Sequence, residues 1–229
     1  MSAIFLPLWL RIVLVPLYVG SIVLCAELGH YWQWFAAEQS RKIVHIGTGN
    51  VIALAWLLQL PAWVGITSAI LAGIITLLSY WLPILPGVNS VGRKSYGTFF
   101  YAVSMGLLIA IFWPLKHPEY AVIGILVMAW GDGLAAIIGQ KWGRHPYQIL
   151  GNSKSLEGTA TLLLVSYVVT TIVLFIVYGN LPIVWLVGIP VGIAAVILES
   201  ISQFGIDNIT LPLGAAALAF WLTEILPGT

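Results

Sequence analysis

The sequence predicts an all-α integral membrane protein, a compact bundle of about seven or eight transmembrane helices. Hydrophobic residues make up 60% of the 229 residues and charged residues only 7%, whereas soluble domains carry about a quarter charged residues. The apolar residues gather in runs of roughly 20, the length that a helix needs to cross a bilayer. Because the connectors are short, we expect residues 1–229 to form a single polytopic domain.

Eight apolar runs mark the expected helices. The first, Ile4–Ala26, is too long for the core of a signal peptide and follows no basic segment, so we expect a membrane helix. Pro190 interrupts the seventh run, which leaves open a bundle of seven helices with one re-entrant segment. The eight expected spans are Ile4–Ala26, Ile43–Leu60, Ala62–Leu82, Gly97–Trp113, Glu119–Gly139, Gly158–Tyr178, Ile183–Ser200 and Ile209–Leu226.

Basic residues are distributed unevenly over the connectors. The even-numbered connectors carry only Lys116, so the positive-inside rule places the odd-numbered connectors in the cytosol. All the polar motifs then face one side of the membrane. The nine basic residues form no tract, and nothing indicates a nucleic-acid partner. The basic residues of the odd-numbered connectors are Arg41, Lys42, Arg93, Lys94, Lys141, Arg144 and Lys154.

Asp132 lies between two glycines inside the fifth apolar run. A carboxylate in a membrane helix costs about 2.5–3.5 kcal/mol on insertion scales, so it needs a partner or a function. Ala135, Ala136 and Gly139 follow at helical spacing, and this small-residue stripe predicts that the acid faces a closely packed helix. We interpret Asp132 as a ligand of Mg²⁺, which prefers carboxylate oxygens. The alternative is a buried salt bridge to a connector lysine.

A polar connector rich in glycine and cations follows this run. Glycines let backbone N–H groups approach an anion, and Lys154 stands where the next helix should begin, so the helix dipole favours an anion there. A cationic cytosolic loop is also ordinary in membrane proteins, and an acid in a first helical turn explains Glu157 equally well. The candidate phosphate-binding residues here are Lys141, Arg144, Lys154, Ser155, Glu157 and Gly158.

Two other cationic clusters lie at expected helix starts. Arg41, Lys42 and His45 can share one helical face, where the cations could hold phosphate and His45 could accept a proton from an alcohol. Topology anchors and a buried histidine are the alternative. Arg93 and Lys94 are equally well explained as phosphate ligands or as an interfacial anchor.

Glu199 and Asp207 flank the last connector. Asp207 can cap the eighth helix, which leaves Glu199 less well explained, and together they could supply a second cation site. Asn208 is a candidate nucleotide ligand beside them. The sequence contains no P-loop, protein-kinase catalytic loop or zinc spacing, so any phosphoryl transfer would use no soluble kinase fold.

Five motifs in this order resemble those of the membrane polyprenol kinases, which include phytol, farnesol and dolichol kinases, with CTP-dependent diacylglycerol kinases as relatives. They span about residues 41–215, the expected catalytic core, and are most similar to the phytol kinases of cyanobacteria and plastids. The motifs are Arg41-Lys42-Ile43-Val44-His45, Ser95-Tyr96-Gly97-Thr98, Gly131-Asp132-Gly133, Lys154-Ser155-Leu156-Glu157-Gly158-Thr159, and Glu199 with residues 205–212.

The resemblance implies transfer of the γ-phosphoryl group of CTP to an isoprenoid alcohol such as phytol, with Mg²⁺, at the cytosolic face of a cyanobacterial, plastid or bacterial inner membrane. The product would serve tocopherol synthesis or the salvage of chlorophyll phytol. Asp132, Lys154 and His45 would then be catalytic, and Asp132, Glu199 and Asp207 would hold metal. Membrane lipids would surround the bundle.

Three alternatives remain at this point. The Lys-Ser-Leu-Glu-Gly element is also similar to one in phosphatidate cytidylyltransferases, so the product could be a CDP-lipid. The acceptor could instead be diacylglycerol. A small cation-coupled transporter could use Asp132 and Glu199 as ion sites, although the sequence has no visible internal repeat and its polar groups collect at one face.

Overall fold

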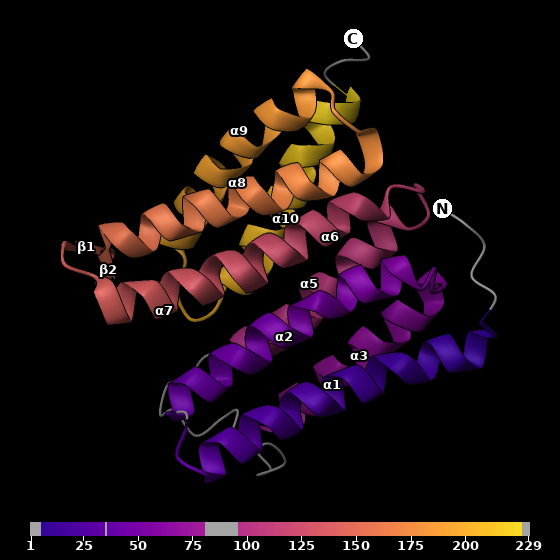
Figure 1. Cartoon of the computed structure of the whole chain (residues 1–229), viewed down its shortest axis with the longest axis horizontal. Coiled ribbons are helices and arrows are strands. Elements are labelled where there is room, and N and C mark those ends of the chain that lie inside the picture. Colours follow the sequence, from indigo (N-terminus) through magenta and orange to yellow (C-terminus); the bar gives the residue numbers. More distant parts are fainter. Residues whose placement is uncertain (1–5, 35, 81–95, 226–229) are drawn as a thin grey trace.

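The computed structural model describes residues 6–34, 36–80 and 96–225. Over this part of the chain, eight helical segments run back and forth through one bundle (Figure 1). One segment is composite, because a π-helical turn, η1, joins α6 to α7. The segments are α1 (Leu8–Tyr31), α2 (Ala37–Leu57), α3 (Ala62–Leu78), α5 (Gly97–Phe112), α6 (Pro118–Leu126) with η1 (Val127–Asp132) and α7 (Gly133–Trp142), α8 (Leu156–Tyr178), α9 (Pro182–Ile201), and α10 (Asp207–Phe220) with η2 (Trp221–Ile225).

The predicted fold class is confirmed, and each expected span corresponds to one helical segment. Five of the described helices are long and apolar enough to cross a membrane, and α3 and α5 are shorter apolar helices. Many large apolar side chains point outward, as in a bundle surrounded by lipid. The helix α9 continues through Pro190, so no re-entrant segment forms there.

The core is centred on α6. Residues 120–123 and Ile125 are at most 1% exposed, and α2, α5, α8 and α10 all pack against this helix. Gly124 permits the closest of these approaches, since a Cβ there would lie 2.3 Å from the carbonyl oxygen of Pro212 in α10. Small residues let membrane helices pack this tightly, and the central helix thereby fixes the position of η1 and Asp132.

The connector after α7 differs from the expected loop. It folds into an antiparallel hairpin of β1 (Pro146–Ile149) and β2 (Asn152–Ser155). Leu150 and Gly151 form its turn, both with positive φ, the backbone conformation of a tight hairpin turn. The hairpin lies at one end of the bundle, beside the start of α8 (Figure 1).

A polar cluster occupies the opposite end of α8 from this hairpin. The hydroxyl of Tyr178, at the end of α8, lies within hydrogen-bond distance of the carboxylates of both Glu119 in α6 and Glu224 in η2. His117 lies 2.9 Å from Glu119, whose side chain is 5% exposed. This cluster joins α6, α8 and η2 at that end of the bundle.

Candidate active site

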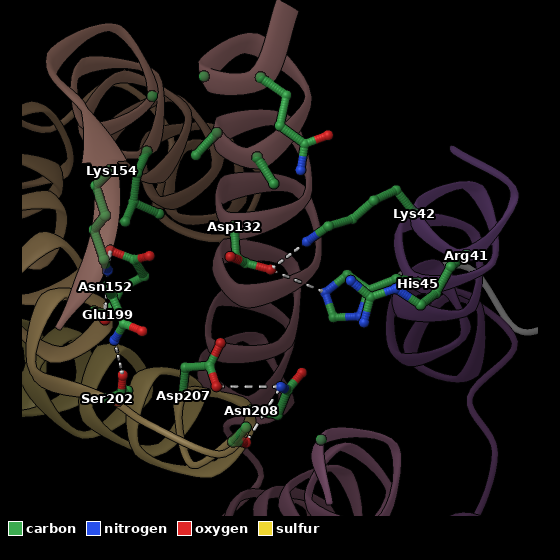
Figure 2. A pocket seen from close by; sticks show the side chains of 18 of the residues that line it. Arg41, Lys42, His45, Asp132, Asn152, Lys154, Glu199, Ser202, Asp207 and Asn208 are labelled. Atoms are coloured by element: carbon green, nitrogen blue, oxygen red, sulfur yellow. Dashed lines mark hydrogen bonds and ion pairs between the residues drawn. The ribbon is translucent and has the colours of Figure 1, made fainter. Parts of the chain in front are cut away.

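A cavity of about 830 Å³ lies at the hairpin end of the bundle. Its walls come from α2, η1, α7 and the hairpin, from the starts of α5, α8 and α10, and from the end of α9 and the residues that follow α3 and α9. Polar side chains from segments far apart in sequence point into it (Figure 2). The predicted gathering of polar motifs at one end of the bundle is therefore observed.

Asp132 stands at one side of the cavity, as the last residue of the π-helical turn. Such turns inside α-helices are frequent at functional sites. Its Oδ2 lies 2.9 Å from Lys42 Nζ and 3.8 Å from His45 Nε2, both on α2. The predicted alternative of a salt bridge is thus present. The carboxylate nevertheless borders the cavity, because its side chain remains 18% exposed.

The stripe of small residues after Asp132 serves two purposes. Ala135, Ala136 and Gly139 line the cavity. The same stripe packs closely on α8, since a Cβ at Gly158 would lie 2.9 Å from the carbonyl oxygen of Ala135. The predicted close helix contact is confirmed, and it holds the start of α8 against the cavity.

The ring of His45 lies between Tyr101 of α5 and the backbone of Met128 in η1, with which it forms a hydrogen bond. Its ring stacks on Tyr101 with centroids 5.0 Å apart, and the hydroxyl of Tyr101 donates to the His45 carbonyl oxygen. Its Nε2 is buried and has no hydrogen-bond partner within the described ranges. A lone pair at this nitrogen could therefore accept a proton.

A second charged cluster stands across the cavity from Asp132. Lys154 of β2 reaches the end of α9, where its Nζ lies 2.6 Å from Glu199 Oε2 and donates to the Glu199 carbonyl oxygen. Asp207 borders the same cavity and accepts a hydrogen bond from Asn208. Figure 2 shows Asp207 between the two clusters.

One local prediction was wrong. Asp207 was expected to cap α10, but Ile206 occupies the cap position and Asp207 is the first helical residue, with no capping hydrogen bond. Its carboxylate is consequently free to face the cavity. Ser155 is the residue that caps a helix here, because its Oγ accepts the hydrogen bond of the Gly158 N–H at the start of α8.

The structure does not bring all the candidate residues together. Lys141 places its ammonium over the ring of Trp142. Glu157 pairs with His145 at 2.7 Å. Neither Lys141, Arg144 nor Glu157 is among the residues that line the cavity. Arg93 and Lys94 lie outside the described residues.

Several lining residues had no place in the sequence prediction. They carry hydroxyl or amide groups, and most stand near a helix end on the predicted cytosolic side, which is a signal that could have found them. Thr48, near the middle of α2, and Tyr101, one turn inside α5, are the exceptions. These residues are Thr48, Tyr80, Tyr101, Gln140, Asn152, Ser202 and Gln203.

Comparison with known proteins identifies the family. The chain is 53% identical over 215 residues to the phytol kinase of Synechocystis sp., covering 94% of this chain and 92% of that protein. The chain belongs to the phytol kinase family. Membership confirms the predicted resemblance and the predicted class, a membrane kinase that phosphorylates an alcohol. No family model and no solved structure matches the chain.

More distant relatives align over most of the chain. The probable phytol kinase 1 of Glycine max chloroplasts is 27% identical over 208 residues, covering 80% of this chain and 66% of that protein. The CTP-dependent diacylglycerol kinase 1 of Schizosaccharomyces pombe is 26% identical over 206 residues, covering 81% and 82%. Both similarities fit a kinase, and neither supports the transporter alternative.

Proposed function

We propose that this protein transfers the γ-phosphoryl group of CTP to phytol or a closely similar isoprenoid alcohol, on the cytosolic side of its membrane. One observation carries the proposal. In a chain 53% identical to a phytol kinase, cations and carboxylates from five separate elements meet in one cavity at the end of the bundle. Phosphoryl transfer needs positioning and charge neutralisation above all.

The charge pattern favours a nucleotide that arrives with a divalent cation. Arg41, Lys42 and Lys154 line the cavity and can neutralise phosphate oxygens. Three carboxylates line it as well and would repel a bare triphosphate. A divalent cation bound between the carboxylates and the phosphates would remove this electrostatic repulsion. The cavity carboxylates are those of Asp132, Glu199 and Asp207.

The residues present fit Mg²⁺. This ion takes hard oxygen ligands and commonly binds through one or two carboxylates together with substrate phosphates. Lys42 and His45 both lie against Oδ2 of Asp132, which leaves Oδ1 for a metal. Asp207 and Glu199 could hold a second ion. When bound, Mg²⁺ would offset the charge of the phosphates.

The acceptor alcohol must lose a proton as its oxygen attacks phosphorus. We assign this proton to His45, because its Nε2 has no other hydrogen bond within the described part of the chain. The neighbouring carboxylate of Asp132, 3.8 Å away, would stabilise the resulting imidazolium. Lys42 then holds Asp132 in place.

CTP is proposed as the donor because a relative is named a CTP-dependent kinase. Tocopherol synthesis or phytol salvage would use the product. The cytosolic orientation follows from the positive-inside rule, since the cavity cations lie at the bundle end that carries most of the basic connectors.

Double labelling tests the proposal. Purified protein in nanodiscs would receive phytol, Mg²⁺ and CTP labelled with ³²P at the γ- or α-phosphate, with ATP and diacylglycerol as comparison substrates. The proposal expects γ-label alone in phytyl phosphate, with CDP released. The α-label in lipid would indicate a cytidylyltransferase, and preferential labelling of diacylglycerol would identify a different acceptor. Asp132→Asn serves as the inactive control.

A further inference from the structure

An apolar groove of about 410 Å³ runs between α3 and α5. Its floor consists of small residues, with Ala69 and Gly73 on α3 and Ala102 and Gly106 on α5. Exposed aliphatic side chains such as Ile70 and Ile74 form its rim. The groove is therefore narrow, entirely hydrocarbon and open along its length.

One end of this groove comes close to the active-site cavity. Leu77 and Phe99 line the groove at that end. Tyr80, one turn beyond Leu77, and Thr98, the neighbour of Phe99, line the cavity instead. A 3.1 Å hydrogen bond joins the hydroxyls of Tyr80 and Thr98. Apolar groove and polar cavity thus meet at one hydroxyl pair.

We propose that this groove binds the hydrocarbon chain of the acceptor alcohol, with Tyr80 and Thr98 at the point where its hydroxyl end turns into the cavity. The inference rests on the proposed function, which supplies a long branched alcohol as substrate. It adds where the chain lies and which residues select its length.

The distance from the hydroxyl pair to the far end of the groove fits a long prenyl chain. From Tyr80 to Ile66, or from Thr98 to Ala110, α-helical rise gives about 18–21 Å. The phytyl backbone has 16 carbons, and staggered bonds of about 1.5 Å extend it to roughly 19 Å. By the same arithmetic farnesol reaches roughly 14 Å and geraniol roughly 9 Å.

The spacing of the small residues fits the methyl branches. Ala102, Gly106 and Ala110 on α5, like Ala69 and Gly73 on α3, are four residues apart, which is about 6 Å along a helix. An isoprenoid carries a methyl branch at every fourth carbon, roughly every 5 Å. Each methyl branch can therefore lie over a small residue, whereas a straight acyl chain has no branches to fill the spaces above these residues.

Substitutions that fill the groove at two different distances from the cavity test which lengths of alcohol chain it accommodates. Gly73→Leu blocks the middle, about 10 Å from Tyr80. A Cβ there lies in ordinary contact with Phe99, at 3.8 Å, and the rest of the leucine side chain would occupy the groove. Ala110→Leu blocks the far end, about 18 Å from Thr98, at an exposed position. Gly20→Leu in α1 is the matched control, because nothing lies within 4 Å of an added Cβ.

The readout is kcat/KM for geraniol, farnesol and phytol, with the KM for CTP as a check on the active site. We expect Ala110→Leu to lower the value for phytol at least about 10-fold, the usual effect of blocking a hydrophobic pocket, and to leave geraniol within 2-fold. Gly73→Leu should lower kcat/KM for both farnesol and phytol. Gly20→Leu should change none of the three.

Equal effects of a variant on all three alcohols, or no effect of either Gly73→Leu or Ala110→Leu, would refute the proposal that this groove binds the alcohol chain. Neither result would bear on the kinase activity of the unmodified protein. Should Gly73→Leu fail to fold, Ala110→Leu alone decides between these outcomes. If the unmodified protein phosphorylates no prenyl alcohol, the proposed function fails first and the groove with it.

Discussion

The contact between Lys42 and Asp132 separates a structural function of the acid from a catalytic one. The two side chains lie 2.9 Å apart and are 11% and 18% exposed. If Asp132 served only to satisfy Lys42, and neither residue bound the nucleotide, removing both charges together would preserve the enzyme. If it holds Mg²⁺ for the nucleotide, removing both would restore the fold but not the activity.

The magnitudes follow from the burial of the pair. Breaking a fully buried pair costs about 3–5 kcal/mol, because the remaining charge is uncompensated. Because this pair borders the cavity and is only partly buried, we expect Lys42→Met alone to lower the free energy of unfolding by about 2–3 kcal/mol. At about 2–4 °C for each kcal/mol in a chain of this size, its Tm should fall by roughly 5–10 °C.

The double variant Lys42→Met/Asp132→Asn should recover most of that Tm, since neither charge remains. Its kcat should stay about 10²–10³-fold below the unmodified protein, the usual effect of losing charge stabilisation of a transition state. Thermal unfolding in detergent and steady-state turnover of phytol measure the two quantities. A folded double variant with kcat within about 3-fold of the unmodified protein would refute the assignment of Asp132 as metal ligand.

Three further predictions follow, two for the active site and one for the polar cluster at the opposite end of the bundle. Lys154→Ala should raise the KM for CTP about 10-fold or more in initial-rate kinetics, whereas Lys141→Ala, whose ammonium lies over Trp142 outside the cavity, should change it less than 2-fold; equal effects would contradict the placement of the phosphates. His45→Gln should lower kcat by about 10²–10⁴ with little change in KM, as expected on losing a general base, and an unchanged kcat would clear His45 of that function. Tyr178→Phe should lower the free energy of unfolding by about 1–3 kcal/mol, because Glu119 and Glu224 lose a donor, and a reduced kcat at full occupancy would show that the far-end cluster affects the chemistry.

The helices were predictable from sequence for a simple physical reason. A membrane segment must be apolar over roughly 20 residues and must satisfy its own backbone hydrogen bonds, so composition and length alone mark each span. The hairpin after α7 offered no such signal. Its strands have four residues each, too few for an alternating pattern to stand out, and its turn depends on the positive φ of Leu150 and Gly151.

The site was predictable as a list of residue types but not as a set of contacts. Lys42 and Asp132 are 90 residues apart, and Lys154 and Glu199 are 45 apart. Which cation meets which acid depends on how the helices pack, and single-chain charge patterns do not contain that information. For the same reason Lys141 was predicted at the site from its charge alone, and it lies outside the cavity.

The catalytic function proposed for Asp132 depends on the position of one metal ion. An experimental structure with a non-hydrolysable CTP analogue and Mg²⁺ would test that position most directly. We expect Mg²⁺ within about 2.0–2.1 Å of a carboxylate oxygen of Asp132, with the triphosphate extending toward Lys154. An analogue bound with its phosphates away from both residues, or a metal that contacts neither Asp132 nor Asp207, would contradict the account.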